Sequence, residues 1–120
     1  MGKKILLVDD SEVALEWAKE ALEALGHEIV TYSSSLGIQM TVRKEAPDVV
    51  LLDVNMPALN GDLLCRMLKQ NERTKDVSIL LYSSIDEEEL ESKAASVGAD
   101  GFVRKTQKVD ELREQLRKYL

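Results

Sequence analysis

Five polar residues end or follow short apolar runs and have side chains suited to phosphoryl transfer. They are Asp9, Asp10, Asp53, Ser83 and Lys105. Carboxylate oxygens are preferred ligands of Mg²⁺, which keeps water molecules that a phosphate can replace. An aspartate can attack phosphorus to give an acyl phosphate, and an ammonium or hydroxyl group suits the phosphoryl oxygens. This chemistry requires the five side chains to lie close together. Whether they do depends on the strands and helices that carry them.

The apolar runs predict five strands, which alternate with segments of helical spacing. Each run is short and rich in Ile, Val or Leu. The predicted strands cover residues 4–8, 28–32, 49–53, 78–82 and 101–104. The other segments predict five helices, of which the first is capped by Ser11 and ended by Gly26, and the second covers residues 36–44. Strand–helix units in series imply an α/β fold with a parallel sheet and helices on both faces.

The apolar content of the runs also predicts the strand order. The first, third and fourth runs (ILLV, VVLL and ILLY) are continuously apolar, as expected for strands buried on both faces. Thr31 and Arg104 interrupt the second and fifth runs, which we place at the edges. The flavodoxin-like, doubly wound order 2-1-3-4-5 satisfies this assignment and places ligands outside the carboxyl ends of the strands. All five polar residues then converge at one edge of the sheet.

Convergence at that edge gives the carboxylates a specific role. Asp9, Asp10 and Asp53 would repel one another unless a cation joined them. The backbone carbonyl of Asn55 could supply a further oxygen to Mg²⁺. Asp53 would be the nucleophile, with catalysis resting mainly on positioning and charge neutralisation. Taken alone, an Asp-Asp-Ser run after a strand is an ordinary turn and helix cap. The joint placement of the five residues favours the chemical interpretation.

Four sequence blocks resemble the signature blocks of the receiver domains of two-component response regulators. They are ILLVDDS, DVVLLDVNMPALNGDLL, ILLYSS and GADGFVRK, in the family's order and spacing. The resemblance extends over nearly the whole chain, and we therefore expect one receiver domain over residues 1–120. It implies that Asp9 and Asp10 hold Mg²⁺ and that Asp53 is the phosphoacceptor. Lys105 matches the lysine that binds the phosphoryl group.

The resemblance also implies a switch and its partners. Ser83 matches the hydroxyl residue that follows phosphorylation, and Phe102 matches the switch aromatic on the fifth strand. The face formed by the fourth helix, fifth strand and fifth helix would then change its affinity for partners. The implied phosphoryl donor is a phosphohistidine on a histidine kinase or histidine phosphotransfer protein. The implied targets are a downstream protein or an attached output domain, with a phosphorylation-dependent dimer as a further expectation. The chain would catalyse only its own phosphoryl transfer and dephosphorylation.

Three other functions compete with a phosphorylation switch. A pseudo-receiver would dock partners without phosphorylation, and two departures leave it open: Thr106, where receivers usually carry proline, and Ser84, where they commonly carry Ala or Gly. An aspartyl phosphohydrolase usually needs a carboxylate two residues after the nucleophile, where this chain has Asn55. A flavodoxin-like cofactor binder needs a phosphate loop after the first strand, where two aspartates would repel a phosphate. The intact acidic set favours the phosphorylation switch.

The composition limits the partners and the location. The chain has 120 residues, 44% of them hydrophobic, which fits one domain with an ordinary core. Its net charge of −6 argues against direct binding to nucleic acid or to a membrane surface. No apolar run approaches the ~18 residues of a membrane span, and residues 1–4 do not open a secretory signal. Together with a single cysteine, Cys65, these features predict a cytoplasmic protein.

Four further features have ordinary structural interpretations. His27 is expected in an exposed turn between the first helix and the second strand, away from the carboxyl edge. Cys65 is expected to pack in or beside the core, and Trp17 to lie on the apolar face of the first helix. The acidic run of residues 86–91 is expected to begin the fourth helix, because negative charge is favourable at a helix N-terminus.

Overall fold

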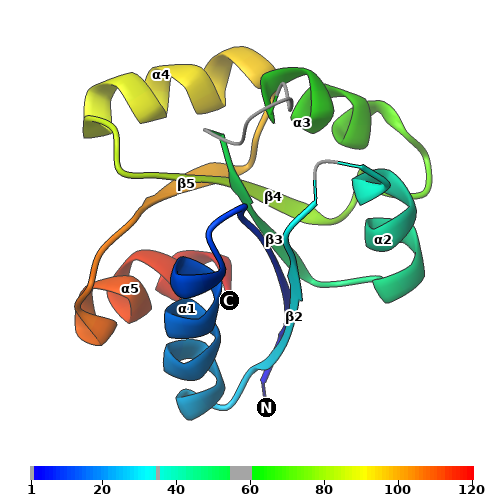
Figure 1. The fold of residues 1–120 in the computed structure, drawn as a ribbon. Coiled ribbons are helices and arrows are strands. Elements are labelled where there is room, and N and C mark those ends of the chain that lie inside the picture. Colours follow the sequence, from blue (N-terminus) through cyan, green and yellow to red (C-terminus); the bar gives the residue numbers. More distant parts are fainter. Residues whose placement is uncertain (1, 35, 55–60) are drawn as a thin grey trace.

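Within residues 2–34, 36–54 and 61–120, which this computed structural model describes, five parallel strands form a single sheet (Figure 1). The strands are β1 (Lys4–Val8), β2 (Glu28–Tyr32), β3 (Val49–Asp53), β4 (Ser78–Ser83) and β5 (Gly101–Arg104). Their order is β2-β1-β3-β4-β5, which confirms the flavodoxin-like order and both edges expected from the sequence. The strand bounds also match, except that β4 includes Ser83.

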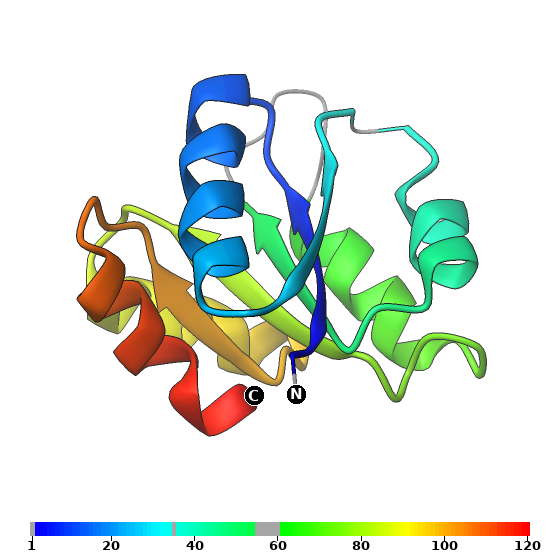
Figure 2. The same ribbon diagram turned by 90° about the horizontal axis from the view of Figure 1, so that it is seen from below.

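Five helices in the same described ranges cover the two faces of the sheet. They are α1 (Glu12–Ala24), α2 (Ile38–Glu45), α3 (Gly61–Gln70), α4 (Glu87–Val97) and α5 (Val109–Leu116), and the short 3-10 helix η1 (Arg117–Tyr119) continues α5. Helices α1 and α5 lie on one face, and α2, α3 and α4 lie on the other (Figure 1, Figure 2). Strand–helix units in series were expected to give these three layers. In the part of the chain that the structure describes, no helix has the length and apolar character needed to cross a membrane.

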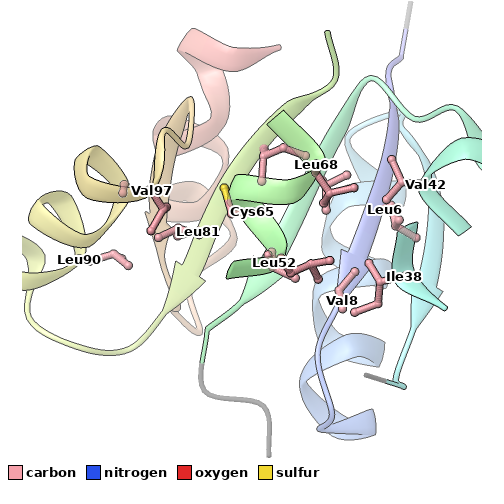
Figure 3. Packing of buried hydrophobic residues seen from close by; sticks show 14 residues of the cluster. Leu6, Val8, Ile38, Val42, Leu52, Cys65, Leu68, Leu81, Leu90 and Val97 are labelled. Carbon is pink, nitrogen blue, oxygen red and sulfur yellow. The ribbon is translucent and has the colours of Figure 1, made fainter. Parts of the chain in front are cut away.

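The hydrophobic core has two parts, one on each side of the sheet. Alternate strand residues point to opposite faces, and for this reason the continuously apolar runs contribute to both parts. In β1, Leu6 and Val8 pack toward α2, α3 and α4, whereas Ile5 and Leu7 pack toward α1 and α5. Figure 3 shows the cluster beneath α2, α3 and α4, in which Cys65 is fully buried, as expected. Packing on both faces fixes the strands and thereby the positions of their carboxyl ends.

Polar side chains and glycines set the helix ends. Ser11 accepts a hydrogen bond from an amide of the first turn and caps α1, and Gly26, at φ 94°, follows the last turn. Asp86 caps α4, which confirms that the acidic run begins a helix. The second helix, expected over roughly residues 36–44, is confirmed as α2, but it begins later than expected. That helix begins only after Gly37, which has a left-handed conformation at φ 74°.

Two expectations about aromatic side chains are corrected in part. His27 is half-buried rather than exposed, and its Nδ1 atom accepts a hydrogen bond from the Lys3 amide at 3.0 Å. This bond ties the turn before β2 to the segment that leads into β1. Trp17 packs against the cluster under α1 and α5, which confirms its place on the apolar face of the helix. It is only half-buried, however, and also lines a surface groove beside the carboxyl edge.

Candidate functional site

The parallel register brings three carboxylates together at the carboxyl edge of the sheet. Val8 pairs with Leu52 across β1 and β3, and the residues that follow them, Asp9 and Asp53, therefore lie level with each other. Oxygen atoms of Asp9, Asp10 and Asp53 all lie within 4.8 Å of one another. Asp9 and Asp53 are each 2% exposed, whereas Asp10 is exposed. Like charges at this separation repel one another and favour a bound cation.

One oxygen of Asp9 has no hydrogen-bond partner among the residues that the structure describes. The Oδ1 atom accepts a hydrogen bond from the Ser11 amide at 3.0 Å. The Oδ2 atom is buried and accepts no hydrogen bond from the described residues. Lys105 Nζ lies 2.7 Å from Oδ2, within ion-pair distance but outside hydrogen-bonding geometry. A buried carboxylate oxygen in this state suits a cation, and a set of three carboxylates fits Mg²⁺.

Lys105 follows β5 and its side chain extends to the carboxylates. Its backbone amide donates a hydrogen bond to the Ser83 carbonyl at 2.8 Å, which continues the β4–β5 pairing beyond Arg104. Its Nζ atom lies 2.7 Å from Asp9 Oδ2 and 3.5 Å from Asp53 Oδ2, and the side chain is 26% exposed. The ammonium group is therefore within reach of an anionic group formed on Asp53.

Thr106 organises the loop that follows Lys105. The described peptide bonds are all trans, including the one that joins these two residues. Thr106 Oγ1 donates a hydrogen bond to Glu111 Oε2 at 2.7 Å and accepts one from the Lys108 amide at 3.1 Å. The two bonds tie the loop that carries the lysine to the first turn of α5.

The two expected switch residues lie on the same face of the sheet. Leu81 packs on the face covered by α4, and Ser83, two residues further along β4, points to the same face. Phe102 packs against the cluster on that face. Ser83 is fully buried, and its Oγ atom accepts a hydrogen bond from the Ile85 amide at 3.2 Å. Phe102 is half-buried and lines a hollow of about 300 Å³ with residues of α4, α5 and η1. Asn55, expected to offer a backbone carbonyl to Mg²⁺, lies outside the described residues.

Tyr82 also belongs to the site, although its place in the sequence does not predict this. It pairs in register with Asp53 across β3 and β4 and is 4% exposed. Lys105 Nζ lies 5.3 Å from the centroid of its ring. Burial, and then the negative charges of Asp9 and Asp53, raise the pKa of Tyr82 to about 12. The only signal in the sequence was its place one residue before Ser83, within a run that resembles an ordinary core strand.

A groove of about 640 Å³ lies beside the carboxylates, between α1 and the loop after β5. Its lining combines apolar side chains of α1, such as Val13 and Trp17, with polar residues of the loops. Ser84, which stands where receiver domains commonly carry Ala or Gly, is exposed and forms part of the wall of the groove. The groove also reaches Lys105, and the site is thus open to solvent on the α1 side.

Comparison with known proteins assigns the family. A family model for the response regulator receiver domain matches residues 5–117. The chain belongs to this family. Receiver domains interact with histidine kinases and downstream effectors in two-component systems, and they generally bind Mg²⁺. This confirms the resemblance of the four sequence blocks to receiver-domain signatures.

Relatives of this receiver domain include regulators of different lengths. It is 33% identical to the phosphate regulon transcriptional regulatory protein PhoB of Pseudomonas aeruginosa over 105 residues, which are 88% of this chain and 46% of that protein. The chain thus spans less than half the length of that relative. It is 23% identical to the polar-differentiation response regulator DivK of Brucella ovis over 120 residues, covering 98% of that protein. The chemotaxis response regulator CheY4 of Vibrio cholerae has a similar structure, with a TM-score of 0.88 at 26% identity and 100% coverage of both chains.

Proposed function

We propose that this receiver domain accepts a phosphoryl group on Asp53, with Mg²⁺ bound beside it. Phosphorylation would then change partner binding at the face formed by α4, β5 and α5. The observation that carries the proposal is the meeting of three carboxylates with Lys105 at the carboxyl edge of the sheet. Clustered like charges, two of them buried, are characteristic of functional sites, because their mutual repulsion lowers stability and a structural role would not explain them. Catalysis would be confined to the domain's own phosphorylation and dephosphorylation.

Asp9, Asp10 and Asp53 are the residues that would hold Mg²⁺. The buried Oδ2 atom of Asp9, which accepts no hydrogen bond from the described residues, supports this role most directly. The backbone carbonyl of Asn55 is proposed as a further ligand, although that residue is not among those described. When bound, the cation would neutralise the carboxylates and the phosphoryl oxygens.

Asp53 is the proposed nucleophile because it ends the central strand β3 and lies buried within reach of Lys105. One carboxylate oxygen would form an O–P bond while the P–N bond of a phosphohistidine donor breaks. The electron pair of the P–N bond returns to the imidazole nitrogen, and the product is an acyl phosphate on Asp53. Lys105 Nζ, 3.5 Å from Asp53 Oδ2, would pair with a phosphoryl oxygen.

The proposed switch connects the acyl phosphate to the α4–β5–α5 face. Ser83 would give up its hydrogen bond from the Ile85 amide and turn its hydroxyl group toward the phosphoryl oxygens. Phe102, packed on the same face of the sheet beside the hollow between α4 and α5, would move in response. The change in shape and charge at that face would alter its affinity for partners.

The proposed donor is a histidine kinase or a histidine phosphotransfer protein, and the proposed target is a downstream protein or an attached output domain. Relatives that share the receiver fold are described as transcriptional regulators or as a polar-differentiation regulator. The output is therefore a property of the partner and not of the fold. A dimer formed on phosphorylation through the α4–β5–α5 face is a further part of the proposal.

Labelling of the whole chain with Mg²⁺ and acetyl phosphate tests the proposal. Intact-protein mass spectrometry is expected to show one added phosphoryl group, and borohydride reduction followed by peptide sequencing is expected to place it on Asp53. Asp53→Ala should abolish the addition. Asp76→Ala, which removes an exposed carboxylate in the turn before β4, should leave it unchanged. Labelling that survives Asp53→Ala would contradict the proposal, and no labelling of the wild type would favour docking without phosphorylation.

A further inference from the structure

The ring of Tyr82, on the face of the sheet covered by α1 and α5, lies close to the ammonium group of Lys105. Tyr82 is buried near the end of β4, between Asp53 on β3 and Val103 on β5 in the strand register. Lys105 Nζ lies 5.3 Å from the ring centroid, within the distance of about 6 Å at which a cation is attracted to an aromatic face. The ring belongs to a central strand packed on both faces, and its position is therefore fixed by the core.

The other described contacts of the Lys105 ammonium group are with carboxylates that change during the proposed reaction. Its Nζ atom lies 2.7 Å from Asp9 Oδ2 and 3.5 Å from Asp53 Oδ2. Both carboxylates are proposed ligands of Mg²⁺, and Asp53 is the proposed phosphoacceptor. A bound cation would compete for the oxygens that hold the lysine, and an acyl phosphate would replace one of them. An anchor that neither event alters would keep the ammonium group near the site.

We propose that Tyr82 is a positioning residue, whose aromatic face keeps the Lys105 ammonium group in place to bind the phosphoryl oxygens. This inference rests on the proposed function of Asp53 and Lys105. The attraction comes from the face of the ring and does not depend on the phenolic hydroxyl. Phenylalanine can therefore replace Tyr82 in this role, whereas an aliphatic side chain cannot.

The protonation state of the phenol is consistent with this role. Burial and the neighbouring carboxylates raise the pKa of Tyr82 to about 12, and the ring is therefore neutral at ordinary pH. A neutral ring adds no charge to a site that already contains three carboxylates. The face of the ring can therefore attract the ammonium group and still leave it available to bind the phosphoryl oxygens.

Phosphorylation kinetics of matched variants test the inference. With Mg²⁺ and acetyl phosphate, we expect Tyr82→Phe to react at the wild-type rate and Tyr82→Leu to react about threefold to tenfold more slowly. Tyr119→Leu is the matched control, because it removes a ring at the same 5.3 Å from a lysine ammonium group, that of Lys118, away from the site. It should react at the wild-type rate.

A double-mutant cycle separates positioning from an effect on the fold. In a Lys105→Ala background, Tyr82→Leu should slow the reaction no further, because the residue through which it acts is absent. An equal slowing in both backgrounds would overturn the inference, as would equal rates for the wild type and Tyr82→Leu. Failure of the wild type to react at all would instead count against the proposed function.

Nuclear magnetic resonance gives a measurement that needs no phosphorylation, and its deciding observation is made on the wild type alone. In the wild type, with and without Mg²⁺, the ring current of Tyr82 should shift the ε-methylene protons of Lys105 upfield of those of other lysines. Tyr82→Phe should keep this shift, and Tyr82→Leu should lose it. Wild-type Lys105 protons at the position of an exposed lysine, with or without Mg²⁺, would overturn the inference whatever the kinetics show.

Discussion

Lys105 Nζ lies 2.7 Å from the Oδ2 atom of Asp9, nearer than its 3.5 Å distance from Asp53 Oδ2. The Asp9 atom is also the buried oxygen that accepts no hydrogen bond from the described residues. In the absence of a metal ion, the lysine therefore offsets part of the negative charge at the site. A divalent cation would have to approach an oxygen that already has a positive neighbour.

Replacement of Lys105 is expected to tighten Mg²⁺ binding while slowing phosphorylation. Lys105→Ala removes the competing positive charge, and the dissociation constant for Mg²⁺ should fall about fivefold, or roughly 1 kcal/mol for a partly solvated pair. The same variant loses the proposed partner of the phosphoryl oxygens and should react more slowly with acetyl phosphate. Isothermal titration gives the Mg²⁺ affinity directly.

The matched control is Lys108→Ala, which removes an exposed lysine in the same loop and should change neither the Mg²⁺ affinity nor the rate of phosphorylation. Weaker Mg²⁺ binding by Lys105→Ala would contradict the competition between this lysine and Mg²⁺.

Replacement of Asp10 is expected to weaken Mg²⁺ binding and to raise the stability of the metal-free protein. Asp10 is exposed but belongs to the group of carboxylates within 4.8 Å of one another. Asp10→Asn should weaken Mg²⁺ binding by about tenfold, because one charged oxygen ligand is lost. Without Mg²⁺ the variant should unfold at a higher urea concentration than the wild type, because the repulsion is reduced. Glu12→Gln, an equivalent change in the first turn of α1, should show neither effect. If the two variants behaved alike, Asp10 would be an ordinary surface residue.

The carboxylates of the site could be predicted because a parallel sheet determines where strand ends lie. Once the first and third apolar runs are taken as adjacent central strands, the residues after Val8 and Leu52 must come to the same level. The positions of these two residues do not depend on the loops. The position of the Lys105 side chain does depend on a loop, and the sequence predicted only that it would approach this edge.

Tyr82 and Gly37 show why the rest could not be predicted. In an apolar run, a tyrosine that supports a lysine has the same pattern as one that only fills the core, and no spacing links Tyr82 to Lys105. Gly37 interrupts a segment of helical spacing, and sequence alone does not reveal that it has φ 74° and delays the start of α2. The sequence does not reveal that His27 is half-buried, because its hydrogen bond comes from a backbone amide distant in sequence, that of Lys3. Contacts of this kind depend on tertiary packing.

Ionisation of Tyr82 is expected to reduce stability in alkaline solution. Its pKa is raised from 10.0 to about 12 in the folded protein, chiefly by burial. Well below pH 10 the phenol is protonated in both the folded and the unfolded chain, and its ionisation does not affect the free energy of unfolding. As the pH rises from 10 toward 12, the unfolded chain ionises first, and stability falls through that window. The total loss is about 2 to 3 kcal/mol, at ~1.4 kcal/mol per pKa unit.

Urea denaturation of the wild type and Tyr82→Phe at several pH values measures this loss. Phenylalanine cannot ionise, and the variant should keep the stability that the wild type loses above pH 10. Other groups that titrate in this range are common to both proteins, and their contributions cancel in the difference. A constant difference between the two proteins across the window would show that Tyr82 titrates normally in the folded state.

The hydrogen bonds of Thr106 are expected to matter more for the position of the lysine-bearing loop than for stability. Thr106→Val keeps the shape of the side chain but removes the donor to Glu111 Oε2 and the acceptor of the Lys108 amide. Glu111 and Lys108 are exposed, and water can replace the lost bonds; the free energy of unfolding should therefore fall by only about 0.5 to 1 kcal/mol.

The same substitution should release the start of α5 from the loop, because Thr106 is the residue that joins them through these bonds. Hydrogen exchange at the Lys108 amide should become faster, and phosphorylation should slow about twofold as Lys105 samples more positions. Glu111→Gln is the informative control, since its side-chain carbonyl can still accept the bond from Thr106 without a charge. It should protect the Lys108 amide as the wild type does. Fast exchange in Glu111→Gln as well would mean that the loop is held by the charge of the glutamate and not by the threonine hydroxyl.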